Sequence, residues 1–307
     1  MSASLPYHPD PRLGRLSMDA AVAAVEAAVG GDLDPEREPA RSAVPAQGGH
    51  LLTMPSVGDR YVGVKLVSVA SGNPAHGLPR IQGLYILFDA ATLSPLSIMD
   101  GTQLTALRTP AVSAVAARHL AAAEAQRLLL FGTGPQAHGH VEALRRVLPL
   151  TRIEVAGRRP EAVDAFVAHW RDRGVEIAPA TAGSVSRADV VCCCTDAREP
   201  LFAGTDVAAH ALVIAVGSHT PDARELDAAL FARGTTVVES RATALREAGD
   251  VIQALAEGAV EEKDLVTLQQ VVRGPGRPPV TRPRIFKSTG MAWQDLAVAV
   301  AAYEHEA

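Results

Sequence analysis

The sequence of 307 residues is poor in cysteine, in aromatic residues and in net charge. Its three cysteines stand together at 192–194 in an apolar run, so they cannot form a disulfide framework and are typical of reduced thiols in a buried strand. The 29 basic residues are balanced by 34 acidic ones, which leaves no basic field for nucleic acid or anionic lipid. No apolar run is long enough to cross a bilayer, and residues 1–10 lack the apolar core of a signal peptide. These absences favour a cytoplasmic protein that acts on small molecules.

Several catalytic motifs are also absent. His138 and His140 are two residues apart on an expected helix and so point to different faces, and no second pair of ligands stands at zinc spacing. We therefore expect no metal. The sequence contains neither a G-x-S-x-G elbow nor a Walker phosphate loop, which argues against a serine hydrolase and a P-loop NTPase.

The most informative segment is the apolar run at 128–131 that leads into a G-x-G-x-x-A turn and then a helix. This order is typical of a dinucleotide site. Gly132 permits the sharp turn, Gly134 lets the backbone approach a pyrophosphate, and Ala137 allows the helix to pack closely on the strand. The helix then points its free N–H groups and positive dipole end at the phosphates.

The pattern of elements predicts two domains in an α/β fold. Strands and helices alternate after the glycine turn, which indicates a Rossmann domain with a doubly wound parallel sheet at 114–284. Short strands between 51 and 99 indicate a second, α+β domain with an antiparallel or mixed sheet, formed by residues 1–113. An alanine-rich helix at 102–123 joins the two, and residues 285–307 are expected to return to the N-terminal sheet.

The end of the second Rossmann strand indicates which coenzyme is bound. An acidic residue there would hydrogen-bond the ribose of NAD, whereas cationic groups accommodate the additional phosphate of NADP. The strand ends in Gly157, Arg158 and Arg159, and Glu154 stands too early for the ribose role. Because two guanidinium groups can bind a phosphate, NADPH is favoured over NADH.

Segments spread from about 54 to 295 resemble the ornithine cyclodeaminase/μ-crystallin family. They are V-K-L-V at 64–67, M-D-G at 99–101 with L-T-A-L-R-T at 104–109, the glycine turn with Gln136, and F-K-S-T-G-M-A at 286–292 followed by D-L at 295–296. The resemblance implies a homodimer in which the α+β domain serves dimerisation and substrate binding. It also implies an active site in the cleft where the nicotinamide meets Lys65 and Arg108.

The segment after the fifth Rossmann strand indicates the branch of the family. Cyclodeaminases place an aspartate two residues after the strand-ending glycine, whereas this sequence has His219 there. That difference argues against ornithine cyclodeamination. The pattern A-V-G-x-x-x-P-D-x-R-E-L-D at 215–227 resembles the μ-crystallin branch, whose members are NADPH-dependent ketimine reductases. The expected reaction is reduction of Δ1-pyrroline-2-carboxylate or Δ1-piperideine-2-carboxylate to L-proline or L-pipecolate.

The chemistry of this reaction assigns roles to a few side chains. Arg108 can hold the substrate carboxylate bidentately, and a desolvated Lys65 can add a second donor. Hydride attack on a ketimine is fast only when the nitrogen is protonated, and His219 can supply that proton near neutral pH. Lys65 or water can also do so, and His219 can instead cap the following turn, so the donor stays open.

These arguments define the residues expected at the site. The catalytic candidates are Lys65, Arg108 and His219. The substrate-binding candidates are Met54, Lys65, Arg108, Ser288 and Gly290. The cofactor-binding candidates are Thr109, Gly132, Thr133, Gly134, Pro135, Gln136, Ala137, Gly157, Arg158, Arg159, Thr195, Val216, Gly217 and Lys287.

Three other functions stay as alternatives. An amino-acid dehydrogenase of the same family, of the alanine dehydrogenase or reductive-amination type, would condense a 2-oxo acid with an amine before reduction. An ornithine cyclodeaminase is the other alternative within the family, although His219 argues against it. A crystallin-like protein would use NADP only to order a pocket for a small ligand, and the aromatic content of 4% argues against it.

Overall fold

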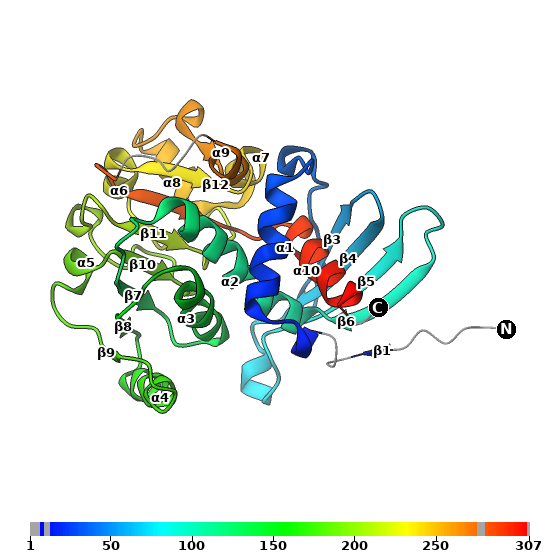
Figure 1. Cartoon of the computed structure of the whole chain (residues 1–307), viewed down its shortest axis with the longest axis horizontal. Helices are drawn as coiled ribbons and strands as arrows, with labels where there is room; N and C mark the ends of the chain where they lie inside the picture. Colours follow the sequence, from blue (N-terminus) through cyan, green and yellow to red (C-terminus); the bar gives the residue numbers. More distant parts are fainter. Residues whose placement is uncertain (1–6, 9–12, 275–279, 306–307) are drawn as a thin grey trace. The chain divides into compact units, whose positions relative to one another are not determined.

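The computed structural model describes residues 7–8, 13–274 and 280–305, and the chain separates into two compact units (Figure 1). The first unit comprises residues 1–112 and 291–307, and the second comprises residues 113–290. The boundary between them falls within helix α2 (Gly101–Leu120). Among the described residues, no helix has both the length and the apolar character needed to span a membrane.

The first unit is built on a mixed sheet of six strands in the order β1-β6-β5-β4-β3-β2. These strands are β1 (Tyr7–His8), β2 (Ser42–Ala46), β3 (Gly49–Val57), β4 (Tyr61–Val69), β5 (Ile81–Asp89) and β6 (Pro95–Asp100). All neighbours are antiparallel except β1, which pairs with β6 in parallel. The expected mixed sheet is therefore confirmed.

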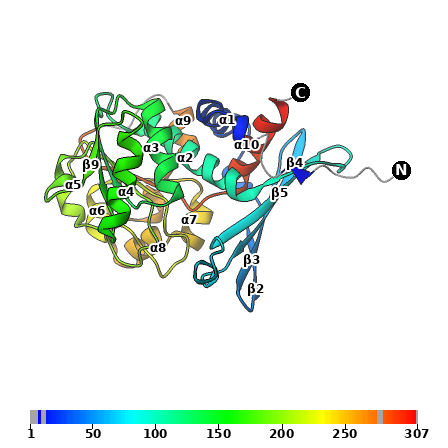
Figure 2. The same cartoon turned by 90° about the horizontal axis from the view of Figure 1, so that it is seen from below.

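One helix packs on a face of this sheet, and a second helix packs beside the first. Helix α10 (Ala292–Glu304) packs on β3, β4 and β5 and lies beside α1 (Met18–Gly30) (Figure 2). Alternation along the strands turns buried side chains such as Met54, Lys65 and Tyr85 toward one face. The other positions of β4 to β6 carry apolar side chains that stay partly exposed: Val62, Val64, Leu66, Leu84, Ile86, Phe88 and Ile98.

The second unit contains eight parallel strands in the order β13-β12-β14-β11-β10-β7-β8-β9. They are β7 (Arg127–Phe131), β8 (Arg152–Ala156), β9 (Ile177–Pro179), β10 (Val190–Cys193), β11 (Leu212–Ala215), β12 (Thr235–Val238), β13 (Val266–Thr267) and β14 (Arg284–Lys287). The helices between them are α3 (Pro135–Val147), α4 (Pro160–Arg171), α5 (Ser184–Arg187), α6 (Ala228–Arg233), α7 (Arg241–Glu247), α8 (Gly249–Ala256) and α9 (Leu268–Arg273). The central strands β10 and β11 are buried along their whole length, as a sheet with helices on both faces requires. The predicted doubly wound parallel sheet is confirmed.

Residues 285–307 were expected to return to the N-terminal sheet. This prediction is wrong for their strand, β14, and right for their helix, α10. Strand β14 pairs in parallel with β11 and β12 in the second unit, and only α10 packs on the sheet of the first unit. Ile285 and Phe286 are fully buried, because β14 lies in the interior of the parallel sheet with a neighbour on each side. Strand β2 was not expected, because all five of its residues are exposed and show no apolar alternation.

Candidate active site

The glycine turn after β7 has the geometry that a dinucleotide site requires. Gly132 has a φ of 111°, and a Cβ atom on it would lie 2.5 Å from the carbonyl oxygen of Cys194, so only glycine fits. Gly134 is the N-cap of α3, and a Cβ atom there would meet nothing within 4 Å. No side chain caps α3, which begins at Pro135, and the buried Ala137 lets the helix lie close to the sheet. The open space at Gly134 and the uncapped helix end fit a pyrophosphate.

Two guanidinium groups stand beside this turn at the end of β8. A Cβ atom on Gly157 would lie 3.3 Å from the Cγ2 methyl of Thr133, which shows how near the two segments are. Arg158 donates from Nη2 to Asp196 at 3.2 Å, and the side chains of Arg158 and Arg159 are 87% and 76% exposed. Both side chains therefore keep N–H donors for a phosphate on the adenosine ribose, which fits NADP(H).

Glu154 does not reach the ribose position. It lies within β8, is mostly buried, and its Oε1 is 3.6 Å from Arg152 and 3.9 Å from Arg187. Its carboxylate is thus used inside the unit, as its early position in the strand predicted.

A buried carboxylate joins the ends of β10 and β11. Glu225 accepts hydrogen bonds from the backbone N–H of Thr195 at 2.8 Å, from the Thr195 hydroxyl at 2.7 Å and from the backbone N–H of Gly217 at 2.8 Å. Glu225 is fully buried, and this burial raises its pKa. The two loops in which Thr195 and Gly217 are predicted to contact the nicotinamide are therefore held together by one side chain.

A second buried carboxylate, Asp250, extends this network. It accepts from the backbone N–H groups of Glu225 at 2.7 Å and Leu226 at 2.9 Å, from the Ser218 hydroxyl, and from Lys287 Nζ at 2.8 Å. Burial opposes its ionisation, but Lys287 and these hydrogen bonds outweigh that effect and lower the pKa of Asp250. Lys287 is wholly buried and also donates to Ser218 at 3.0 Å, so the structure gives it an internal partner that the sequence did not predict.

A third carboxylate orders the segment after β14. The Ser288 hydroxyl donates to Glu239 Oε1 at 2.7 Å, and the backbone N–H groups of Thr289 and Gly290 donate to Oε2 at 2.9 and 3.0 Å. Ser288 and Gly290 stay predicted substrate contacts, and Glu239 is the residue that fixes their conformation.

The first unit brings Lys65 and Arg108 onto one buried carboxylate. Lys65 Nζ lies 2.8 and 2.7 Å from the two oxygens of Asp295, and Arg108 Nε lies 3.1 Å from Oδ1. Lys65 also donates to Thr105 at 3.2 Å, and Arg108 Nη1 donates to Gln294 at 2.7 Å. Strand β4, helix α2 and the first turn of α10 supply these side chains.

The charges around Lys65 set its protonation. Burial lowers the pKa of Lys65 to about 8, Asp295 acts in the opposite direction, and the charges of Arg108 and Arg41 add to the lowering. Lys65 thus stays charged at neutral pH and can give up its proton within a physiological range. Met54, the cross-strand partner of Lys65, is buried beside it.

Three other predicted residues lie outside these clusters. His219 is exposed in the loop after β11, with Nδ1 3.3 Å from the Gly217 carbonyl oxygen. Val216 continues β11, and its N–H donates to Cys193. Thr109 is buried in α2.

Three residues around Lys65 and Arg108 were not predicted: Asp295 and Gln294, which hydrogen-bond to them, and Arg41, whose charge lowers the pKa of Lys65. Asp295 was part of a matching segment, but nothing in one sequence shows that it pairs with residues 230 and 187 positions away. Its position in the first turn of a helix rich in apolar residues was the one available signal.

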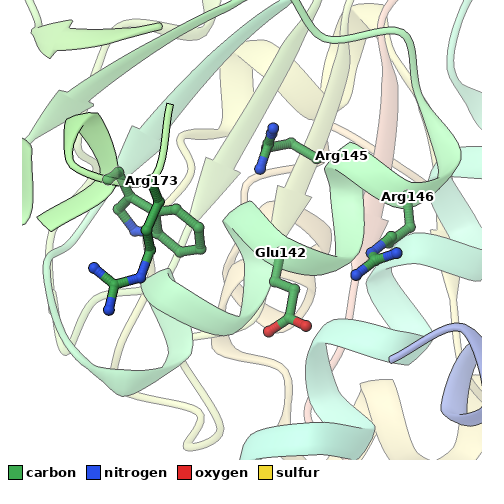
Figure 3. A pocket seen from close by; sticks show the side chains of 5 residues that line it. Glu142, Arg145, Arg146 and Arg173 are labelled. Carbon is green, nitrogen blue, oxygen red and sulfur yellow. The ribbon is translucent and has the colours of Figure 1, made fainter. Parts of the chain in front are cut away.

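A separate cavity of about 560 Å³ contains none of the predicted site residues. Glu142, Arg145, Arg146, Trp170 and Arg173 line it, between α3 and the end of α4 (Figure 3). Its arginines lie in or just beyond the last turns of these helices, where positive charge complements the helix dipole. We therefore place the chemistry elsewhere.

Comparison with known proteins agrees with this geometry. The model of the ornithine cyclodeaminase/mu-crystallin family matches residues 14–307. Delta(1)-pyrroline-2-carboxylate reductase 2 of Burkholderia ambifaria is 37% identical over 261 residues, which cover 84% of this chain and 82% of that protein.

Two solved structures share the whole fold. Delta(1)-pyrroline-2-carboxylate reductase of Thermococcus litoralis, in complex with NADH and L-proline, has a TM-score of 0.89 and 30% identity over 95% of this chain and 94% of that one. An archaeal alanine dehydrogenase, solved as a dimer with bound NAD, has a TM-score of 0.92 and 32% identity over 98% of this chain and 95% of that one.

The two glycines of the turn give a matched test. Gly132→Ala should lower the free energy of unfolding by about 2 kcal/mol or more, because it combines a strained φ with a backbone overlap. Gly134→Ala should change it by less than about 0.5 kcal/mol, since the new methyl meets open space. Both variants should bind coenzyme at least tenfold more weakly, measured by titration with denaturant unfolding in parallel. Equal stability losses in the two variants would contradict this account of the turn.

Proposed function

The chain belongs to the ornithine cyclodeaminase/mu-crystallin family, and from that premise we propose that it reduces cyclic α-imino acids with NADPH. It is an oxidoreductase that acts on carbon–nitrogen bonds. The proposed substrates are Δ1-pyrroline-2-carboxylate and Δ1-piperideine-2-carboxylate, with L-proline and L-pipecolate as products. The observation that carries the proposal is the buried cluster of Lys65, Arg108 and Asp295.

In this proposal Arg108 and Lys65 bind the substrate carboxylate. Asp295 and Gln294 each accept one hydrogen bond from Arg108, so they orient the guanidinium and leave three of its five N–H donors for the substrate. Because these partners are buried, the guanidinium is held in place before the substrate arrives. Preorganisation of this kind lowers the entropic cost of aligning the imine carbon.

The proton for the imine nitrogen is assigned to Lys65. Bound NADPH would supply a hydride to the imine carbon, a step that requires a protonated nitrogen. Lys65, with a pKa of about 8, is charged at neutral pH and is a stronger acid than an ordinary lysine. His219 is exposed and contacts the Gly217 carbonyl, which favours the turn-capping role over proton donation.

The preference for NADPH is supported by Arg158 and Arg159. The similar solved structures hold NADH or NAD. In this chain, two exposed guanidinium groups stand at the end of β8, where a 2′-phosphate would lie, and Glu154 is engaged elsewhere.

The second candidate is an amino-acid dehydrogenase, favoured by the likeness to the archaeal alanine dehydrogenase. Such an enzyme needs the same carboxylate-binding cations and the same hydride donor. It differs in that the imine must form from a 2-oxo acid and ammonia. Ornithine cyclodeamination is disfavoured, because His219 stands where that reaction uses an aspartate.

We also propose that the chain forms a homodimer through the uncovered face of the six-stranded sheet. Val64 and Leu66 on β4, Leu84 and Ile86 on β5 and Ile98 on β6 form an apolar surface that stays partly exposed. Contiguous apolar patches on soluble proteins commonly mark interfaces. A second copy is the occupant proposed here, because the archaeal alanine dehydrogenase that this chain resembles is a dimer.

Light scattering should report twice the chain mass of 32.1 kDa. Ile86→Lys should shift the mass toward the monomer, because a buried lysine at an apolar interface is strongly unfavourable. Val280→Lys, an exposed position of the second unit, should leave the dimer intact. A monomeric wild type, or equal effects of the two changes, would refute this interface.

The function is tested by following coenzyme absorbance with a panel of cyclic imines, 2-oxo acids with ammonia or methylamine, and ornithine. We expect the two cyclic imines to give the highest kcat/KM with NADPH. Faster turnover of pyruvate with ammonia than of either cyclic imine would replace the proposal with the dehydrogenase.

The coenzyme preference has its own control in the same assay. Changing Arg158 and Arg159 together to alanine should raise the KM for NADPH at least tenfold, or about 1.4 kcal/mol, and alter the KM for NADH much less. Equal effects on both coenzymes would remove these arginines from the phosphate site.

The role of Lys65 predicts a specific pH profile. Since the protonated ammonium is the active form, kcat/KM should fall as pH rises through about 8. Asp295→Asn removes the charge that raises the pKa of Lys65, so this decline should move to lower pH. Thr105→Val removes a hydrogen bond to Lys65 but no charge, and should leave the decline near its original pH.

A variant with altered chemistry completes this test. Lys65→Arg keeps a positive charge for the carboxylate but cannot release a proton, so kcat should fall at least a hundredfold with a smaller change in KM. An unchanged kcat in Lys65→Arg, or the same alkaline decline in wild type and Asp295→Asn, would exclude Lys65 as the proton donor.

A further inference from the structure

A cluster of two thiols and one imidazole lies near the glycine turn that follows β7. His140 projects from α3, and Cys192 and Cys194 come from the end of β10. Alternation along the strand places these two cysteines on one face and Cys193 on the other. His140 and Cys192 are fully buried, and Cys194 is partly buried. None of these side chains has a role in the function proposed above.

The distances within this cluster match those around a small tetrahedral cation. The two sulfur atoms of Cys192 and Cys194 are 3.7 Å apart, and Cys194 Sγ is 3.5 Å from His140 Nδ1. For bonds of about 2.3 Å to sulfur and about 2.0–2.1 Å to nitrogen, tetrahedral edges are about 3.8 Å between sulfurs and about 3.6 Å between sulfur and nitrogen. All three ligand atoms lie within 4.8 Å of one another. If the side chain of Cys192 or His140 turns so that its ligand atom moves by about 1 Å, all three atoms come to the spacing of a tetrahedral site.

Two hydrogen-bond partners hold the imidazole. Its Nε2 lies 2.9 Å from the Ser113 hydroxyl, the kind of outer partner that fixes metal-binding histidines. Its Nδ1 lies 2.7 Å from the carbonyl oxygen of Gln136, so without a cation Nδ1 carries the proton and donates it. Binding at Nδ1 requires the proton to move to Nε2, which can then donate to the Ser113 hydroxyl, and requires the imidazole to turn away from the Gln136 carbonyl so that the cation replaces that hydrogen bond.

We propose that His140, Cys192 and Cys194 bind one thiophilic divalent cation of the zinc class. Both thiols lose their protons when the cation binds. Binding of one cation therefore forms two metal–thiolate bonds and one metal–imidazole bond and releases two protons to solvent. The site joins α3 to β10, so a bound cation would stabilise the contact between them, and one tetrahedral position would remain for a water molecule. The expectation of no metal rested on the spacing of His138 and His140, and one sequence does not show that β10 places two cysteines beside His140.

Cobalt(II) titration of the metal-free, full-length protein tests the site directly. We expect thiolate-to-cobalt charge-transfer absorption that saturates at one cobalt per chain. Cys192→Ser and Cys194→Ser should abolish it. Cys193→Ser is the matched control, because this buried thiol faces the opposite side of the same strand. The cobalt absorption of this variant should equal that of the wild type. Absence of the bands in the wild type, or their persistence in Cys192→Ser, would overturn the proposal.

X-ray absorption of the zinc-loaded wild type keeps the test independent of variant folding. The expected shell contains two sulfur atoms and one imidazole nitrogen. A shell of only oxygen and nitrogen would show that zinc binds elsewhere. The zinc-loaded wild type should also unfold at a higher temperature than the metal-free protein, because a ligand that binds only the folded chain stabilises it. An unchanged unfolding temperature at saturating zinc would contradict a structural site.

Discussion

The ion pairs of Asp295 are the constraint on which the first unit and its proposed chemistry depend. One fully buried carboxylate meets the ammonium of Lys65 and the guanidinium of Arg108, which come from positions far apart in the chain. Removing one partner of a buried pair leaves a charge without compensation, at about 3–5 kcal/mol. The pairs therefore fix α10 against β4 and α2 and hold the two cations in the orientation that the proposed carboxylate ligand needs. The same contact completes the fold and would prepare the proposed site.

In the second unit, three buried carboxylates hold loops in place. Glu225 accepts hydrogen bonds from the loops after β10 and β11, Asp250 accepts from the loop after β11 and from Lys287 of β14, and Glu239 accepts from the segment after β14. Loops at the carboxyl ends of such strands have few backbone partners of their own, and buried polar groups must be satisfied. A side chain that accepts several N–H groups satisfies them and fixes the loops relative to one another. Lys287 neutralises part of the resulting negative charge through Asp250. Buried side chains, Glu225 above all, thus order the loops in which Thr195 and Gly217 are predicted to contact the coenzyme.

The sequence predicted local features well and distant pairings poorly. The glycine turn could be read directly, because the left-handed φ of Gly132 and the open space at Gly134 are demands on single residues. The end of the second Rossmann strand was also placed well, because β8 ends at Ala156, directly before Gly157. The placement of β14 failed, because a strand in the interior of a parallel sheet does not show which neighbours it pairs with. Asp295, Glu225 and the cluster around His140 were missed for the same reason, since their partners are set by the tertiary fold.

In the proposed mechanism, the protonation of Lys65 distinguishes imine reduction from oxidative deamination. Both reactions pass through the same iminium and require the substrate carboxylate to be bound in the same way. The proposed role of Arg108 therefore does not distinguish them. Burial pulls the pKa of Lys65 down, while Asp295 holds it near 8, so the group is an acid at neutral pH and becomes a base only above it. An acid beside the imine nitrogen supports reduction of a preformed cyclic substrate, which needs one proton and one hydride. Deamination requires the opposite state, a neutral amine that accepts a proton. In the proposed mechanism, the balance of burial against the charge of Asp295 therefore keeps Lys65 in the protonated form that reduction uses at neutral pH.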